Sequence, residues 1–238
     1  MRTLLIILLN IFACTIIVSA QDFQHRIDSN IKTLQLDSIR NIIIELKSHN
    51  TKGINRYLLY WEAYANYKCA ILCNILKQKK DSEKFIQKAI EQLESIKEKT
   101  TEDYALLGML KNYQINFAGW LTTIKLSNQA KTMAQKAIDI NANNLRAYLV
   151  LGINNYYTPE MYGGKSKCEE YFKKAISLKN QTSGNMYDPT WGKDDAYYFL
   201  LMFYKNRKQE GDLKEFEQIK KDALNMFPSD RRFNRLNY

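Results

Sequence analysis

Glycine, proline and histidine are scarce in this sequence of 238 residues, which contains 9 Gly, 3 Pro and 2 His. So few turn-forming residues argue against a sandwich or barrel and favour long helices. His25 and His49 form no pair with a cysteine or glutamate that is typical of a catalytic or metal site, and the glycines form no phosphate-binding loop. We therefore expect a non-catalytic protein with no metal site and no cofactor.

Cysteine is too rare and too unevenly spaced to provide a disulfide framework. Beyond the N-terminal segment the chain keeps Cys69, Cys73 and Cys168, an odd number. Cys69 and Cys73 are four residues apart, and a helix holds such a pair at a Cβ separation of about 5–6 Å, too far for a relaxed disulfide. We expect all three to be small buried residues.

The first twenty residues have the pattern of a secretory signal peptide. Arg2 supplies a positive charge, residues 4–18 are largely apolar, and small residues lead to Ala20 before a polar stretch. The apolar run is short for an uncleaved membrane anchor, and Phe12 does not suit a lipoprotein signal at Cys14. The interpretation is a signal peptide over 1–20, cleaved after about Ala20. The mature chain would then lie in the periplasm or at the cell surface of a bacterium and would carry no transmembrane segment.

The chain carries a formal net charge of +10, with 35 basic and 25 acidic residues. Its lysines are mostly interspersed with Glu and Asp along the expected helices rather than gathered in one stripe. This pattern is typical of a solvated surface. Together with the signal peptide, it leads us to expect no nucleic-acid partner.

Apolar residues recur at helical spacing along almost the whole chain. Short polar breaks between long helices predict antiparallel neighbours, and hence an all-α architecture. Two longer loops, at 158–164 and 180–191, contain the Gly and Pro typical of turns. The expected helices cover residues 28–47, 55–77, 83–97, 102–124, 128–140, 145–156, 165–178, 194–207 and 213–226.

One spacing of small and bulky residues occurs three times, each time in the second helix of an expected pair. Small residues at a helix crossing let two helices approach closely, and a bulkier neighbour fills the adjacent space. The three sets are Ala130, Ala134 and Ala137; Cys168, Phe172 and Ala175; and Phe216, Lys220 and Ala223.

These sets resemble the tetratricopeptide repeat (TPR), a helix pair of about 34 residues. In the clearest unit, Tyr148 takes the large aromatic position and Leu151-Gly152 the Leu-Gly pair that precede Cys168, Phe172 and Ala175. The resemblance implies an α-α superhelix of about nine helices in one domain over 21–238. The clearest repeats are at about 111–144, 145–182 and 197–230.

The resemblance also implies a concave binding face formed by the first helix of each pair. Aromatic side chains interleaved with basic ones suit an extended peptide or acidic segment. Packing between neighbouring helices is the alternative for the tyrosines, and packing over the helix ends is the alternative for Trp191. The expected partner-binding residues, including two from the long loops, are Arg146, Leu149, Ile153, Tyr156, Tyr157, Tyr162, Trp191, Tyr198, Leu201 and Lys205.

The predicted function is that of an exported, non-catalytic TPR scaffold that binds a protein or peptide partner. An alternative arises because Pro159 with Gly163-Gly164, and Trp191-Gly192, resemble exported bacterial repeat proteins associated with some transporters. In that alternative the chain is a small-ligand-binding accessory component of a periplasmic transport system. Its ligand would be enclosed between the helices and the two long loops, behind Trp191 and Tyr162.

Overall fold

The computed structural model describes residues 23–50, 55–180 and 187–238, and the regular structure within these ranges is entirely helical. The chain divides into two compact units, of residues 1–97 with 182–189 and of residues 98–181 with 190–238. The signal peptide expected over 1–20 and a helix cap expected at Gly53 lie outside the described residues. A single domain over 21–238 stays a prediction.

The first unit contains α2 (Phe23–Lys32), α3 (Leu36–His49), α4 (Arg56–Ile75) and α5 (Lys79–Ser95). Helices α4 and α5 pack against each other, and Ser82 Oγ donates a hydrogen bond to the Ala70 carbonyl at 2.7 Å. The prediction of a single helix over 28–47 was wrong, because the chain breaks between α2 and α3. Leu34 has a left-handed φ of 58°, which no Gly or Pro signals in the sequence.

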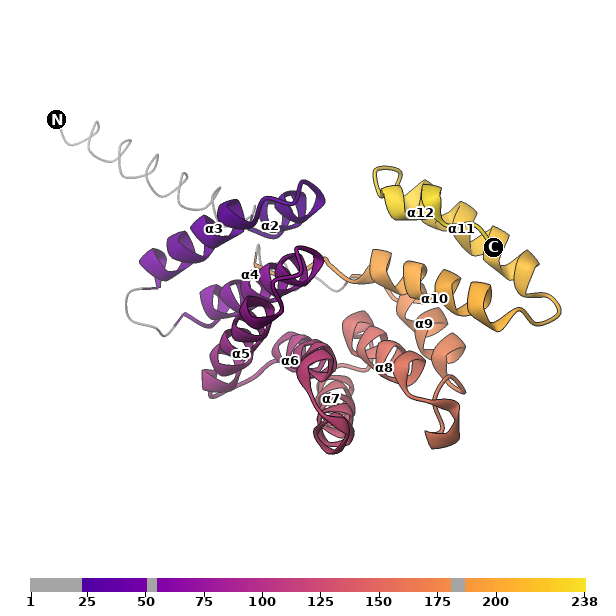
Figure 1. The fold of residues 1–238 in the computed structure, drawn as a ribbon, viewed down its shortest axis with the longest axis horizontal. Coiled ribbons are helices and arrows are strands. Elements are labelled where there is room, and N and C mark those ends of the chain that lie inside the picture. The colour runs from indigo at the N-terminus through magenta and orange to yellow at the C-terminus, as the bar shows by residue number, and fades with distance from the viewer. Residues whose placement is uncertain (1–22, 51–54, 181–186) are drawn as a thin grey trace. The chain divides into compact units, whose positions relative to one another are not determined.

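The second unit contains three helix pairs and a short terminal helix (Figure 1). The elements are α6 (Thr101–Gln114), the 3₁₀ helix η1 (Ile115–Phe117), α7 (Trp120–Ile140), α8 (Leu145–Tyr157), η2 (Glu160–Tyr162), α9 (Cys168–Ser177), α10 (Lys193–Arg207), α11 (Asp212–Met226) and α12 (Arg231–Arg235).

The break between α6 and α7 lies at Ala118 and Gly119, both with extended backbone, rather than after residue 124 as predicted. Apolar residues continue at helical spacing across this turn, so periodicity alone did not locate it. The start of α8 is where the sequence placed it, because the Asn144 side chain accepts a hydrogen bond from Ala147 N at 3.0 Å.

Small side chains at the helix crossings pack as the repeat pattern predicted. Ala130, Ala134 and Ala137 of α7 are fully buried, and so is Phe172 of α9. Gly152 of α8 lies against the Phe172 ring, where an added Cβ would be 2.3 Å from the ring carbon Cε1. The missing side chain of Gly152 therefore makes the space that Phe172 fills.

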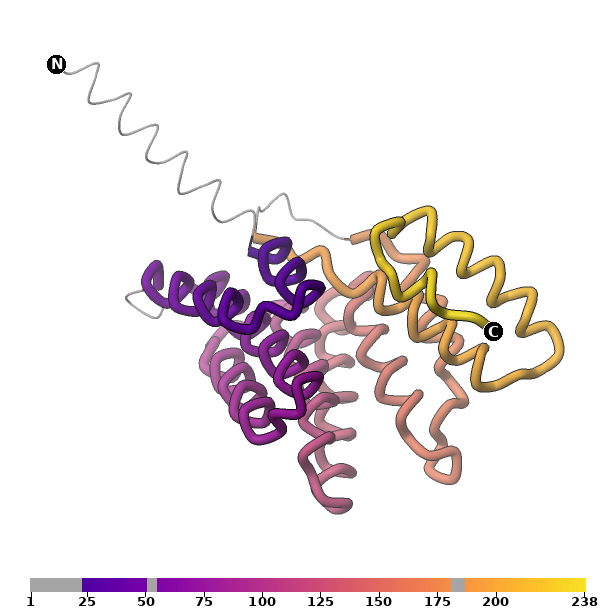
Figure 2. Tube along the Cα trace, turned by 45° about the horizontal axis from the view of Figure 1, so that its top comes forward, coloured from indigo at the N-terminus to yellow at the C-terminus, as the bar shows by residue number. Residues whose placement is uncertain are grey.

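The pairs α6–α7, α8–α9 and α10–α11 follow one another, and α8 also contacts both α6 and α10 (Figures 1 and 2). First helices thus lie beside first helices, and the second helices α7 and α9 each contact the first helix of the next pair. This is the all-α repeat packing predicted from the sequence. Among the described helices, none is long and apolar enough to cross a membrane.

Candidate partner-binding surface

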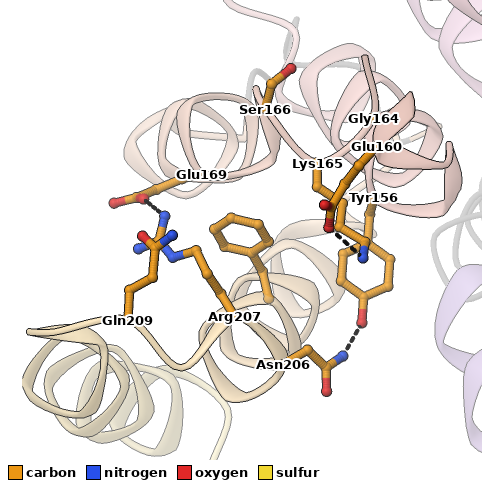
Figure 3. Close-up of a pocket in the computed structure, with 10 residues that line it drawn as sticks. Tyr156, Glu160, Gly164, Lys165, Ser166, Glu169, Asn206, Arg207 and Gln209 are labelled. Atoms are coloured by element: carbon orange, nitrogen blue, oxygen red, sulfur yellow. Dashed lines mark hydrogen bonds and ion pairs between the residues drawn. The ribbon is translucent and has the colours of Figure 1, made fainter. Parts of the chain in front are cut away.

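A cleft of about 770 Å³ opens in the second unit between the α8–α9 connection and the end of α10 (Figure 3). Tyr156 enters it from the last turn of α8, and Glu169 from the first turn of α9. Phe203, Asn206 and Arg207 enter it from the last two turns of α10. Aromatic rings with polar groups around them are a usual composition of a binding site.

The four or so extra residues between α8 and α9 form a compact turn at the edge of this cleft. Gly163 has a φ of 77°, and a Cβ on Gly164 would be 1.8 Å from the Thr158 carbonyl oxygen. Lys165 N donates to the Asn155 carbonyl, and Lys167 N to the Asn155 side chain, each at 2.8 Å. The Gly-Gly pair thus permits a turn that other residues would obstruct.

Ion pairs between helices organise the charged side of the cleft. Arg207 Nη1 contacts Glu169 Oε2 at 2.8 Å, and Arg207 Nε donates to Asp212 Oδ2 at 3.0 Å. Burial raises the pKa of Glu169, but hydrogen bonds from Lys173, Tyr204 and Arg207 outweigh it and leave this pKa below its usual value. The hydrogen bond from Arg207 likewise lowers the pKa of Asp212.

These two depressed pKa values predict a loss of stability in acid. A carboxylate with a lowered folded-state pKa stabilises fully above its unfolded pKa of about 4, and that contribution is lost as pH falls through the folded value. We expect Asp212→Asn to be less stable than wild type at pH 7. Its free energy of unfolding should, however, fall less than that of wild type on acidification. Urea titrations from pH 7 to pH 3 measure this. Equal pH slopes for the two proteins would contradict the assignment.

A cluster of rings lies beside the cleft, on neighbouring first helices α8 and α10. Tyr156, Tyr157 and Tyr198 each contact Phe199, with ring centroids 5.9, 6.2 and 5.8 Å away. Tyr156 OH accepts a hydrogen bond from Asn206 Nδ2. Burial raises the pKa of Tyr156 and of Tyr157, although the Tyr157 side chain remains 69% exposed. We name these four aromatic residues the α8–α10 ring cluster.

Six of the ten expected partner-binding residues keep accessible side chains. Tyr156, Tyr157 and Tyr198 come together in the ring cluster, whereas Tyr162 lies apart from it, in η2. Ile153 is half-buried in α8. Lys205, also half-buried, donates from Nζ to the Asn237 carbonyl. Partner binding by these six stays a prediction.

The other four, Arg146, Leu149, Trp191 and Leu201, are buried, so the structure corrects their expected position on an open face. Leu149 and Leu201 are fully enclosed core residues. Arg146 is enclosed and pairs with the part-exposed Glu102, and its Nη1 donates to the Trp191 carbonyl at 3.0 Å. Trp191 is therefore packed against the start of α8, in agreement with the alternative that it covers helix ends rather than binds a partner.

Phe199, Asn206 and Arg207, which complete the cleft and the ring cluster, were not among the residues predicted from the sequence. Asn206 and Arg207 directly follow the predicted Lys205 in α10, but adjacent residues of a helix point in different directions, so that prediction did not extend to them. Their partners Tyr156 and Glu169 are 50 and 38 residues away in sequence, and no local pattern indicates such pairings.

The three described cysteines are buried and have no reactive or metal-binding arrangement. Cys69, Cys73 and Cys168 are free and buried, and burial raises the pKa of both Cys69 and Cys168 to about 12. Among the described residues, no three His, Cys, Asp or Glu side chains gather closely enough to hold a metal ion.

No protein-family model matches the sequence, and no curated protein matches it. Solved structures do match. A thermophilic TPR protein of Thermus thermophilus, TTC0263, aligns with a TM-score of 0.61 and 16% identity over 89% of this chain and 95% of that one. The HusA haemophore of Porphyromonas gingivalis aligns with a TM-score of 0.55 and 20% identity over 79% and 95%. The chain thus has the TPR-like fold that its sequence predicted.

Proposed function

We propose that this protein is a non-catalytic scaffold that binds a protein or peptide partner through the α8–α10 ring cluster and the adjoining cleft. The observation that carries the proposal is the position of Tyr157. Its large ring stays mostly exposed although it packs against Phe199 on one edge. Aromatic side chains anchored in this way offer contact area at little cost in conformational entropy, and tyrosines are enriched among the residues that dominate binding energy.

The polar side of the cleft supports a peptide as the ligand. Within hydrogen-bonding reach of the ring cluster lies Asn206, whose amide can act as both donor and acceptor. Lys165 and Glu160 form an exposed ion pair across the mouth, at 3.0 Å. Exposed pairs of this kind are weak, so a partner's charged groups can replace either member at small cost.

The sequence alternative of an enclosed small ligand needed Trp191 and Tyr162 to close one pocket. Trp191 is instead buried against Arg146, whereas Tyr162 is exposed beside Trp120. Neither side chain lines the cleft. The resemblance to a haemophore is one of fold, at 20% identity. We therefore do not extend small-ligand binding to this chain, but we retain export to the periplasm or cell surface as part of the proposal.

Replacing Tyr157 by alanine tests the proposed function. We expect the tagged full chain to recover one defined partner from its own cell envelope, and Tyr157→Ala to weaken that complex by about 30-fold, the effect of a hot-spot residue of about 2 kcal/mol. The melting temperature should barely change, because the side chain is mostly exposed. Affinity capture with mass spectrometry, then titration of the purified partner, measures this.

Leu213→Ala is the matched control, since Leu213 is a half-exposed apolar residue of α11 in the same unit. It should leave the affinity unchanged. Equal recovery of the partner by wild type and Tyr157→Ala would refute the assigned surface. Failure of the wild type to capture any defined partner would count against the scaffold itself.

A further inference from the structure

Exposed apolar side chains gather where two helix pairs turn, at the start of α7 and in η2. Trp120 and Leu121 are 61% and 74% exposed, and Met161 and Tyr162 are 81% and 58% exposed. The rings of Trp120 and Tyr162 bring the two turns together, with centroids 6.2 Å apart. Both turns lie at the same edge of the second unit (Figures 1 and 2). We name these four residues, with Ile124, the Trp120 edge.

Apart from the contact between Trp120 and Tyr162, most of this apolar surface stays exposed. The first fully packed side chain of α7 is Leu126, a turn and a half beyond Trp120. Gly119, just before the helix, has open space where a side chain would lie. The other large apolar residues that are exposed in this unit, such as Ile140 and Leu213, lie on other parts of their helices. A concentration of this kind marks an interaction surface rather than ordinary surface composition.

The charges around the Trp120 edge are mainly positive. Residues 115–128 contain Lys125 and no acidic residue, and residues 155–168 contain Lys165, Lys167 and a single acid, Glu160. Glu160 is paired with Lys165 at 3.0 Å, so these two charges offset each other and Lys167 is the remaining charged residue of that range. Lys125 lies one helical turn after Leu121, and both Lys125 and Lys167 are exposed.

We propose that the Trp120 edge docks the protein onto an anionic lipid bilayer, with its rings and aliphatic side chains inserted at the headgroup level. Trp and Tyr favour the membrane interface, where an apolar ring and a polar group are both accommodated. Leu121 and Met161 add apolar surface for the acyl boundary. Neighbouring lysines attract anionic headgroups, each contributing about fivefold in affinity.

The same features disfavour a second copy of this chain as the occupant. The edge consists of two turns that project from helix ends, and a symmetric contact would bring Lys125 and Lys167 near their own copies. Like charges that face each other across an interface oppose association. A bilayer instead presents a deformable apolar layer beneath a negative surface, which matches both properties of the edge.

The tryptophans of the chain give a direct readout. Trp61 and Trp191 are buried, so Trp120 is the one tryptophan that a lipid can reach among the three in the sequence. We expect vesicles that contain phosphatidylglycerol and brominated phosphatidylcholine to quench the fluorescence of the full chain. The apolar segment at 4–18 contains no tryptophan. Insertion of that segment alone would therefore not bring a bromine to Trp120.

Leu121→Asp combined with Met161→Asp should weaken the quenching by at least about tenfold in lipid concentration, because charged groups are costly at the acyl boundary. Leu213→Asp, which adds one such charge at an exposed apolar position of α11, should leave it unchanged. Lys125→Ala with Lys167→Ala should weaken binding to anionic vesicles by about 25-fold, at about fivefold for each lysine.

Absence of quenching in wild type, or equal quenching in the double aspartate variant, would overturn the proposal. So would equal quenching by vesicles of phosphatidylcholine alone, because the lysines would then have no role. Sedimentation of the same samples without lipid measures the oligomeric state and so tests whether a second copy of this chain occupies the edge instead. A dimer that Leu121→Asp dissociates, with no quenching by vesicles, would assign the edge to a second copy.

Discussion

Replacing Arg146 by methionine is expected to lower the free energy of unfolding by about 3–5 kcal/mol, the cost of breaking a buried ion pair from one side. The guanidinium is almost fully buried and contacts the Glu102 carboxylate through Nε and Nη2. It also donates to the Trp191 carbonyl and, at 3.1 Å, to Asn180 Oδ1. Without it, the Glu102 carboxylate keeps the hydrogen bond from Asn144 but loses its cationic partner, and Trp191 and Asn180 lose these hydrogen bonds from α8.

Urea unfolding followed by helical circular dichroism measures this loss. Adding Glu102→Gln to Arg146→Met should restore part of the stability, because the uncompensated charge is then removed as well. Lys131→Met is the control, since Lys131 is an exposed basic residue of α7, and it should change the stability by less than about 0.5 kcal/mol. If Arg146→Met changed the free energy of unfolding as little as Lys131→Met, the ion pair of Arg146 with Glu102 would not stabilise the unit.

Phe172→Ala is expected to cost about 3–5 kcal/mol, as for other fully buried aromatic residues. The ring fills the space left by Gly152 and stacks on Phe199 with centroids 5.9 Å apart. Gly152→Ala alone should cost about 1–3 kcal/mol, because its new Cβ would overlap the ring. The double variant should lose less than the sum of the single losses, since the alanine methyl then enters space that the ring has vacated.

A double-mutant cycle from urea titrations gives the coupling between these two positions. Gly108→Ala offers a comparison within α6, where an added Cβ would be 3.0 Å from Val150 rather than in overlap with a ring. Its cost should be smaller and should add independently to that of Phe172→Ala. Strict additivity between Gly152→Ala and Phe172→Ala would show that these side chains do not share one space.

The sequence predicted the helices best where hydrophobic periodicity and end signals agree. Asn144 caps α8, Pro159 follows its end, and the observed helix Leu145–Tyr157 matches the prediction to one residue. It failed at Leu34 and at Ala118, where the chain turns without the Gly-Pro or Asn-Gly pairs that mark turns. At such positions tertiary packing, rather than local propensity, determines the backbone.

The candidate surface was predictable only in part, because its composition also depends on contacts between residues far apart in the sequence. The repeat resemblance implied an open-face position for Tyr156, Tyr157 and Tyr198, whose side chains are accessible, but implied the same for Arg146, which is buried. The burial of Arg146 depends on Glu102, 44 residues earlier in the chain. The Trp120 edge went unnoticed because its two turns approach each other only after the helices between them have packed.

The buried thiols also determine how the protein responds to its surroundings. A thiol whose pKa lies near 12, as for Cys69 and Cys168, forms very little of the thiolate that attacks disulfides or oxidants. Among the described residues these thiols form no disulfide, so a reducing agent such as glutathione should leave the stability of that part of the fold unchanged. Unfolding would expose Cys69, Cys73 and Cys168, so their alkylation by a small maleimide would measure the rate at which the fold opens.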